Sequence, residues 1–209
     1  MQEKPASLQV ITAAFNDWWF NWVNQWVLNL VWVLSWLTVI LGPPVTLGLY
    51  YVNNRLAHGE SLGLSGLVEG SRRYFLISWL WMFINLVVIA LLGINFFFYT
   101  NFTSPWFDLL QGLFLLLELV WLVVQFYALP YLIVQERKNL GQALRNGLFT
   151  ALAAPGYSVV LGGTALLMGL VCVFTVAPLF LGGPCLIVLL GNLAVLERLE
   201  TFKVRDRQV

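Results

Sequence analysis

Glu118 is the residue of this chain whose chemistry stands out most. It lies inside a long apolar run, between Leu117 and Leu119. A carboxylate at the centre of a membrane helix costs at least about 2.5 kcal/mol on insertion scales. We therefore expect Glu118 to face protein or water rather than lipid. A protonated acid there could donate a hydrogen bond to a hydroxyl-rich ligand or exchange a proton with it.

Other polar residues are spaced so that they could share a cleft with this acid. Gln111 and Gln125 lie seven residues to either side of Glu118, on the same helix face. Asn85 and Thr46 are polar positions of two other apolar segments that we expect to face inward. Such stripes fit a hydrated ligand cleft. They fit equally well hydrogen bonds between helices, each worth about 0.6 kcal/mol on average, and the sequence leaves both interpretations open.

Two Gly/Pro breaks occur at corresponding places in the chain. Gly-Pro-Pro at 42–44 and Gly-Gly-Pro at 182–184 are separated by a constant offset of 140. Because proline lacks an N–H and clashes with the preceding turn, we expect each break to interrupt a helix and free backbone carbonyls. Interrupted membrane helices can mark a binding site, and packing kinks are the alternative. The hypothesis is that Pro44, Pro184 and Glu118 line one cleft.

Catalytic and metal-binding patterns are not evident in the sequence. His58 is the only histidine and has no second ligand nearby, while Cys172 and Cys185 lack CxxC or CxxH spacing. A lone Glu118 has no second group with which to divide acid and base roles. We therefore expect no enzyme activity, no catalytic residues, no metal and no cofactor.

Composition indicates a membrane protein. Of 209 residues, 60% are hydrophobic and 10% are charged, against about 25% charged in soluble domains. The net charge of +1 excludes a basic surface for nucleic acid. No cleavable signal peptide is evident. The lipid bilayer is the expected partner.

Hydropathy predicts an all-α fold, a polytopic membrane helix bundle with five transmembrane helices plus interfacial amphipathic helices. An interfacial helix over 1–22 precedes one transmembrane domain over 23–196, and a charged cytoplasmic tail covers 197–209. The predicted spans are 23–56 (kinked), 74–99, 106–134, 156–177 and 179–196, with surface helices at 62–73 and 140–153. The order helix, surface helix, helix occurs twice, which resembles a degenerate direct repeat.

The fourth predicted span carries a stripe of small residues. Ser158, Gly162, Ala165 and Gly169 follow one another at steps of four, three and four. Small residues at this spacing allow another helix to approach closely. We expect this face to be a packing surface rather than a site of chemistry.

Basic residues indicate the orientation in the membrane. In the five-span prediction, ten of the 11 Lys and Arg residues fall on one side and Lys4 alone on the other. Lys and Arg in short loops accumulate on the cytoplasmic side. The N-terminus is therefore expected outside and the C-terminus in the cytoplasm, in a bacterial inner membrane.

A short motif around the first break resembles a known family. Its residues are Pro44, Thr46, Leu49, Tyr50, Arg55 and Gly59-Glu60. This pattern resembles the YesL-like family of small bacterial membrane proteins, a family of unknown function, and the hydropathy layout resembles it over nearly the whole chain. The resemblance implies a role near carbohydrate uptake. The chain departs from the family in having a single arginine, Arg55, where a more basic cluster is expected.

Two functions follow as expectations. The first is a non-enzymatic inner-membrane protein, accessory to solute uptake or itself a small carrier. The second is a membrane interaction module that docks a cytoplasmic or transporter partner through the 140–153 surface helix. The sequence leaves the substrate and the oligomeric state open.

Overall fold

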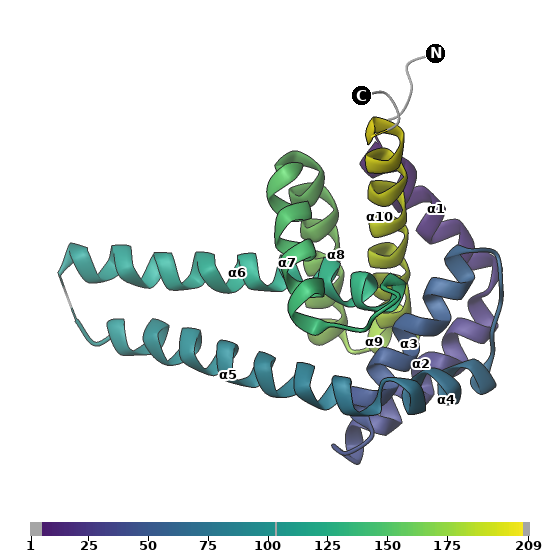
Figure 1. Cartoon of the computed structure of the whole chain (residues 1–209). Coiled ribbons are helices and arrows are strands. Elements are labelled where there is room, and N and C mark those ends of the chain that lie inside the picture. Colours follow the sequence, from purple (N-terminus) through teal and green to yellow (C-terminus); the bar gives the residue numbers. More distant parts are fainter. Residues whose placement is uncertain (1–5, 103, 207–209) are drawn as a thin grey trace.

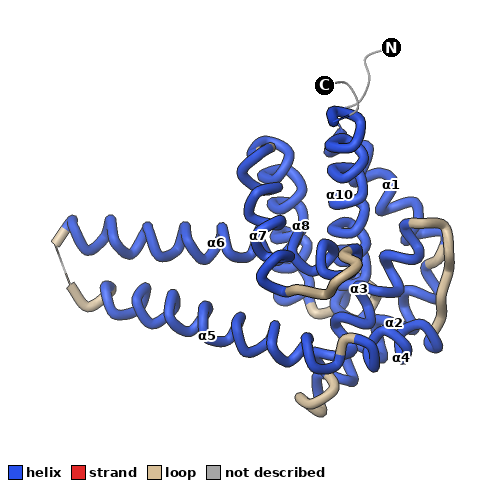
Figure 2. Tube along the Cα trace, viewed as in Figure 1, coloured by secondary structure: helices blue, strands red, loops and turns tan. Residues whose placement is uncertain are grey.

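The computed structural model describes residues 6–102 and 104–206 and consists of helices joined by turns and loops (Figures 1 and 2). The helices are α1 Ala6–Phe20, α2 Trp22–Leu37, α3 Gly42–Ala57, α4 Leu64–Arg73, α5 Phe75–Tyr99, α6 Pro105–Val134, α7 Leu140–Ala153, α8 Pro155–Thr175, α9 Ala177–Phe180 and α10 Gly183–Asp206. The all-α prediction is therefore confirmed for the described residues. Helix α7 has the bounds predicted for the second surface helix.

Helices α5 and α6 form a long antiparallel hairpin that projects from the rest of the molecule (Figure 1). They contain 25 and 30 residues, which correspond to about 37 and 45 Å at 1.5 Å per residue. Toward the tip their apolar side chains are exposed, including Ile94, Phe97 and Trp106. Together with α8, these are the three helices long and apolar enough to cross a membrane among the described residues.

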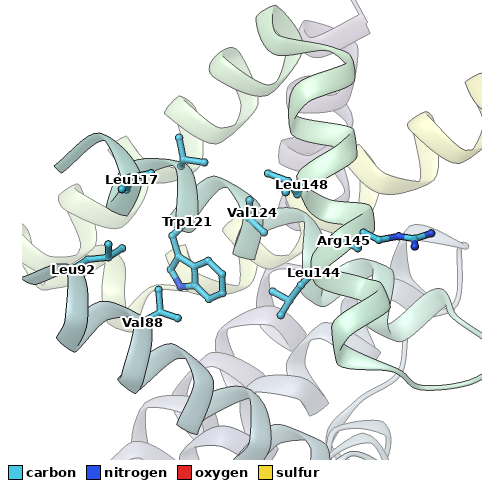
Figure 3. A pocket seen from close by; sticks show the side chains of 9 residues that line it. Val88, Leu92, Leu117, Trp121, Val124, Leu144, Arg145 and Leu148 are labelled. Atoms are coloured by element: carbon cyan, nitrogen blue, oxygen red, sulfur yellow. The ribbon is translucent and has the colours of Figure 1, made fainter. Parts of the chain in front are cut away.

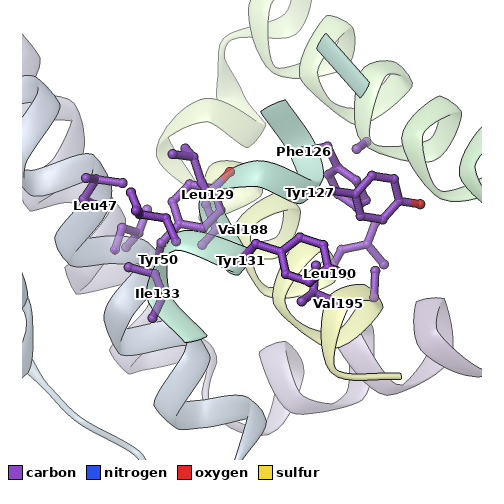
Figure 4. Packing of buried hydrophobic residues seen from close by; sticks show 14 of the residues in the cluster. Leu47, Tyr50, Phe126, Tyr127, Leu129, Tyr131, Ile133, Val188, Leu190 and Val195 are labelled. Carbon is purple, nitrogen blue, oxygen red and sulfur yellow. The ribbon is translucent and has the colours of Figure 1, made fainter. Parts of the chain in front are cut away.

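The core lies where the second half of α6 meets α3 and α10. Every residue from Phe126 to Ile133 on α6 is buried. Figure 4 shows Tyr127 and Leu129 on this stretch in one apolar cluster with Leu47 of α3 and Val188 of α10. The helix continues through Pro130, so this proline does not end it. Helix α6 thus has a buried base half and an exposed tip half.

The first predicted span, 23–56, is not a single kinked helix. Helix α2 ends at Leu37, Val39 adopts a positive φ of 59°, and α3 begins at Gly42 with proline in its first turn. Trp32 Nε1 donates to Thr46 Oγ1 at 2.9 Å, which shows that α3 turns back along α2. Proline suits the first turn because its missing N–H has no helical acceptor there. Gly-Pro-Pro therefore starts a helix instead of bending one.

The second Gly/Pro break, at 182–184, also starts a helix. Val176 has a φ of 59°, Gly182 has a φ of 103°, and α10 begins at Gly183 with Pro184 in its first turn. Helix α10 then runs to Asp206 without interruption. Helix α10 thus continues across residue 197, the predicted boundary between the last span and the charged tail.

The predicted repeat is visible as two consecutive units, α3–α4–α5 and α6–α7–α8. In each unit the first helix touches the short second helix through glycine. An added Cβ at Gly70 would lie 3.0 Å from Gly48 Cα, and one at Gly147 would lie 3.1 Å from Ala128 N. In each unit one residue, Tyr74 or Ala154, separates the second helix from the third. The two units therefore share a helix order and a mode of close packing.

Helix α1 lies along α10 in the opposite direction. Trp18 near the end of α1 donates from Nε1 to Gly182 O at 3.1 Å, beside the start of α10. Val10 and Ala14 of α1 are buried in the same core as Ala194 of α10. The first residues of α1 and the last of α10 consequently lie at the same end of the molecule (Figure 1).

Candidate functional site

Asn85 and Gln125, two of the residues expected in a polar cleft, are hydrogen-bonded between α5 and α6. Trp81 Nε1 on α5 donates to Gln125 Oε1 on α6 at 2.9 Å, and Trp121 Nε1 on α6 donates to Asn85 Oδ1 on α5 at 3.1 Å. Each helix thus supplies one indole donor and one amide acceptor. We call these four residues the hairpin clasp. The clasp favours interhelical hydrogen bonding as the role of both amides.

The clasp also shows where Glu118 and Gln111 lie. Continuing its antiparallel register toward the tip pairs Tyr99 with Phe107, whose rings stack with centroids 5.8 Å apart. The same register sets Glu118 at the level of Val88 and Gln111 at the level of Asn95 on α5. Glu118 is half-buried and has no hydrogen-bond or ion-pair partner among the described residues. The α5 residue at its level is therefore apolar.

The remaining predicted cleft residues lie elsewhere. Thr46 accepts from Trp32 and donates to Gly42 O at 2.8 Å, so both of its hydroxyl functions are used within α2 and α3. Pro44 and Pro184 each sit in the first turn of a helix. Asn54 of α3 donates to Asn192 of α10 at 3.2 Å. Helices α3 and α10 are parallel, because both run opposite to α2.

The predicted residues therefore separate into three places. The two prolines lie at the same end of the parallel pair α3 and α10, Asn85 and Gln125 lie in the hairpin clasp, and Glu118 lies beyond the clasp toward the tip. Two surface pockets, one between α5, α6 and α7 and one beside α8 and α9, include none of Glu118, Pro44 and Pro184 among their lining residues. What divides them is the projection of the α6 tip half away from the core (Figure 1).

The small-residue stripe on α8 is only partly a contact surface. Ser158, Gly162 and Ala165 are buried, and an added Cβ at Gly162 would lie 3.1 Å from Val123 Cγ2. Tyr127 donates to Ser158 Oγ at 3.1 Å. At Gly169, by contrast, nothing lies within 4 Å of an added Cβ. The close approach predicted there is not seen, although Cys172, further along α8, is buried beside Gly183.

The base of the hairpin carries a compact aromatic and basic contact. Tyr74, between α4 and α5, is buried, and Arg73 Cζ and Lys138 Nζ lie 5.9 and 5.7 Å from its ring centroid. Lys138 Nζ also donates to Ile133 O at 2.7 Å, at the end of α6. Burial, and then the charge of Arg73, lower the pKa of the Lys138 ammonium. The start of α5 and the end of α6 are thereby held together at the base of the hairpin.

Arg198, in the stretch predicted as a charged cytoplasmic tail, packs on α8 from within helix α10. Its guanidinium carbon lies 3.7 Å from the centroid of the Tyr157 ring, and its Nε lies 3.3 Å from Glu197 Oε2. The Arg198 side chain is 16% exposed. A cation over a tyrosine face is attracted by the ring quadrupole. Charge alone, counted along the sequence, does not indicate this contact.

An apolar groove lies beside the hairpin. It has a volume of about 470 Å³ and lies between α5, α6 and α7. Its walls include Val88, Leu92, Leu117, Trp121, Leu144 and Leu148. Figure 3 shows the Trp121 ring in the groove and Arg145 leaving its rim, directed away from the indole. The hydrogen bond to Asn85 fixes the Trp121 ring as a wall.

Comparison with known proteins gives no family, relative or structure to which this chain can be assigned. No family model matches the sequence, and neither the curated proteins nor the solved structures contain a significant match. The fold and the exposed hairpin define the class of protein. Over the residues that the structure describes, the chain is all-helical and has three helices long and apolar enough to span a membrane.

Proposed function

We propose that this chain is an integral membrane protein anchored by the α5–α6 hairpin, and that it acts as a non-enzymatic accessory protein in solute uptake. The observation that carries the proposal is the hairpin itself. Its tip half exposes apolar side chains on most of its surface, which lipid would solvate and water would not. The process, carbohydrate uptake in a bacterial inner membrane, is suggested by the resemblance to the YesL-like family.

The basic residues at the base of the hairpin support an orientation. Arg72 and Arg73 precede α5, and Arg137 and Lys138 follow α6, whereas the connection from Thr100 to Ser104 contains no Lys or Arg. Under the positive-inside rule, the base is cytoplasmic and the tip faces the other side. The five-span arrangement predicted from hydropathy belongs to the same proposal, with the roles of α2–α3, α8 and α10 in the membrane open.

A carrier is less well supported than an accessory protein. A carrier needs a hydrated path with free polar groups, and three of the residues expected to line it, Thr46, Asn85 and Gln125, are engaged by tryptophan indoles. A membrane interaction module is the second candidate. Helix α7 packs one face on α6 yet leaves Phe149 and Leu152 60% and 66% exposed, as a docking helix would.

Cysteine labelling tests the anchor. In a chain with Cys172 and Cys185 replaced by alanine, Ser104→Cys at the tip should react with an impermeant thiol reagent added to intact cells. Asn139→Cys at the base should react only after the membrane is opened. Equal reaction of both positions in intact cells, or protection of Ser104→Cys together with reaction of Asn139→Cys, would refute the proposed anchor.

A further inference from the structure

The groove beside the hairpin ends in an unpaired positive charge. Arg145 lies on its rim and has no acidic partner within ion-pair distance among the described residues. Among the described residues, its guanidinium makes a cation–π contact with the Phe149 ring, whose centroid lies 5.9 Å from Arg145 Cζ. The other residues that line the groove are apolar, apart from the indole of Trp121, whose N–H is already bonded to Asn85.

The direction of the groove follows from the hairpin. Leu92 and Leu117 each lie 17 residues from the base ends Phe75 and Val134, or about 26 Å along the helices. Arg145 is on α7, which packs on α6 near Val124 and Ala128 through Gly147. The charged end of the groove is therefore the end nearer the base, and the apolar end points toward the tip.

We propose that this groove binds one anionic phospholipid of the surrounding bilayer, with an acyl chain along Trp121 and Leu117 and the phosphate on Arg145. The inference rests on the proposed membrane anchor, because the base must lie at the level of the lipid headgroups. An apolar wall with one cation at its outer end complements an amphiphile with a negative headgroup. The planar guanidinium suits a phosphate because it can donate two parallel hydrogen bonds.

A bilayer lipid fits this groove better than a soluble anion or a peptide helix. A soluble phosphate would use Arg145 and leave the apolar walls uncovered. The groove is continuous with the exposed face of the hairpin, which the proposed anchor places in lipid, so a chain can enter sideways without crossing water. In Figure 3 the guanidinium points off α7 and away from the groove, so binding a headgroup at the rim requires the Arg145 side chain to turn from the Phe149 ring.

Lipid competition on the full-length protein tests the inference. The purified protein is mixed in detergent with equal amounts of phosphatidylglycerol and phosphatidylcholine of identical chains, and the retained lipid is counted by mass spectrometry of the intact protein. Wild type should retain phosphatidylglycerol in roughly fivefold excess, the effect expected from one basic residue facing an anionic headgroup. Arg145→Gln should abolish the excess, and the exposed control Arg137→Gln should keep it. Leu148→Trp, which fills the groove, should lower the retention of both lipids.

Three results would overturn the inference. They are an equal retention of the two lipids by wild type, an equal loss in Arg137→Gln and Arg145→Gln, and displacement of phosphatidylglycerol by glycerol phosphate, which has the headgroup charge without the chain. If the Leu148→Trp variant unfolds, the comparison of Arg145→Gln with Arg137→Gln still tests the inference. Because this assay is done in detergent, it can fail while the labelling of Ser104→Cys succeeds, and the reverse also holds.

Discussion

Glu118 is the one acidic side chain of α6 that lies between the clasp and the tip region, and its surroundings differ from those expected of a ligand site. It is half-buried, at the level of Val88 in the register of the hairpin, with no polar partner among the described residues. An unpaired carboxylate in an apolar helix pair is costly to the fold. The residue type was readily singled out in the sequence. Its separation from Pro44 and Pro184 was not, because hydropathy does not show which half of a helix leaves the core.

Replacing Glu118 tests whether this acid destabilises the fold. Glu118→Leu should raise the stability of the purified protein by about 1 to 2.5 kcal/mol, because it removes the burial cost and adds apolar contact. Glu118→Gln should fall between wild type and Glu118→Leu. Thermal unfolding in detergent measures both. Glu136→Leu, at an exposed position after α6, is the control and should change stability by less than about 0.5 kcal/mol. A lower melting temperature for Glu118→Leu would show that the acid has a stabilising partner.

At the scale of the helices, the three prolines show how far helix ends could be predicted from the sequence. Pro44, Pro130 and Pro184 all lie in apolar runs, yet Pro130 lies inside α6 whereas the other two stand in first turns. The difference comes from the preceding residues. Thr38 Oγ1 accepts from Leu41 N at 3.3 Å, and Val39 has a positive φ, so the chain turns before Gly42. Helix content and the bounds of α7 were therefore predictable, and the reversal between α2 and α3 was not.

The hairpin clasp was only half predictable. Asn85 and Gln125 were recognised as inward polar residues, but their partners are Trp81 and Trp121, and the position of an indole N–H does not follow from hydropathy. In an apolar surrounding, each bond also fixes the helix register. The two hydrogen bonds of the clasp thus align α5 with α6 close to the groove.

A double-mutant cycle measures this alignment. Trp81→Phe and Gln125→Leu each remove one end of the same hydrogen bond, so the double variant should lose less stability than the two single changes together. The expected coupling is about 0.6 kcal/mol and at most about 1.7 kcal/mol, from thermal unfolding in detergent. Trp81→Phe with Asn95→Leu serves as the control pair, since Asn95 bonds within its own helix. Strict additivity for Trp81 and Gln125 would mean that the bond does not stabilise the hairpin.

At the scale of the whole molecule, the places of the two chain ends bear on the predicted orientation. The five-span prediction puts the N-terminus outside and the C-terminus in the cytoplasm. In the structure α1 lies beside α10 in the opposite direction, with Trp18 on Gly182 O. The orientation was predicted from the count of basic residues along the sequence, and that count does not include the reversal between α2 and α3.

Single cysteines distinguish the two arrangements. In the background without Cys172 and Cys185, Thr12→Cys and Thr201→Cys should be labelled from the same side of the membrane, because both positions are exposed and the first residues of α1 and the last of α10 lie at the same end. Comparison of intact and permeabilised cells gives the side. Labelling of Thr12→Cys from outside, with Thr201→Cys protected, would restore the opposite-sided arrangement.

The neighbouring ends of α1 and α10 make the chain a candidate for circular permutation. A short polar linker could join residue 209 to residue 1, since the described ends already lie side by side (Figure 1). New ends could then be opened at the Thr100–Ser104 connection, far from the core. Such a permutant would begin with α6 and end with α5. Helix α6 would then be synthesised first and α5 last, so the two arms of the hairpin would enter the bilayer separately. Recovery of the native fold from that order would show that the clasp, rather than the tip connection, pairs the two arms.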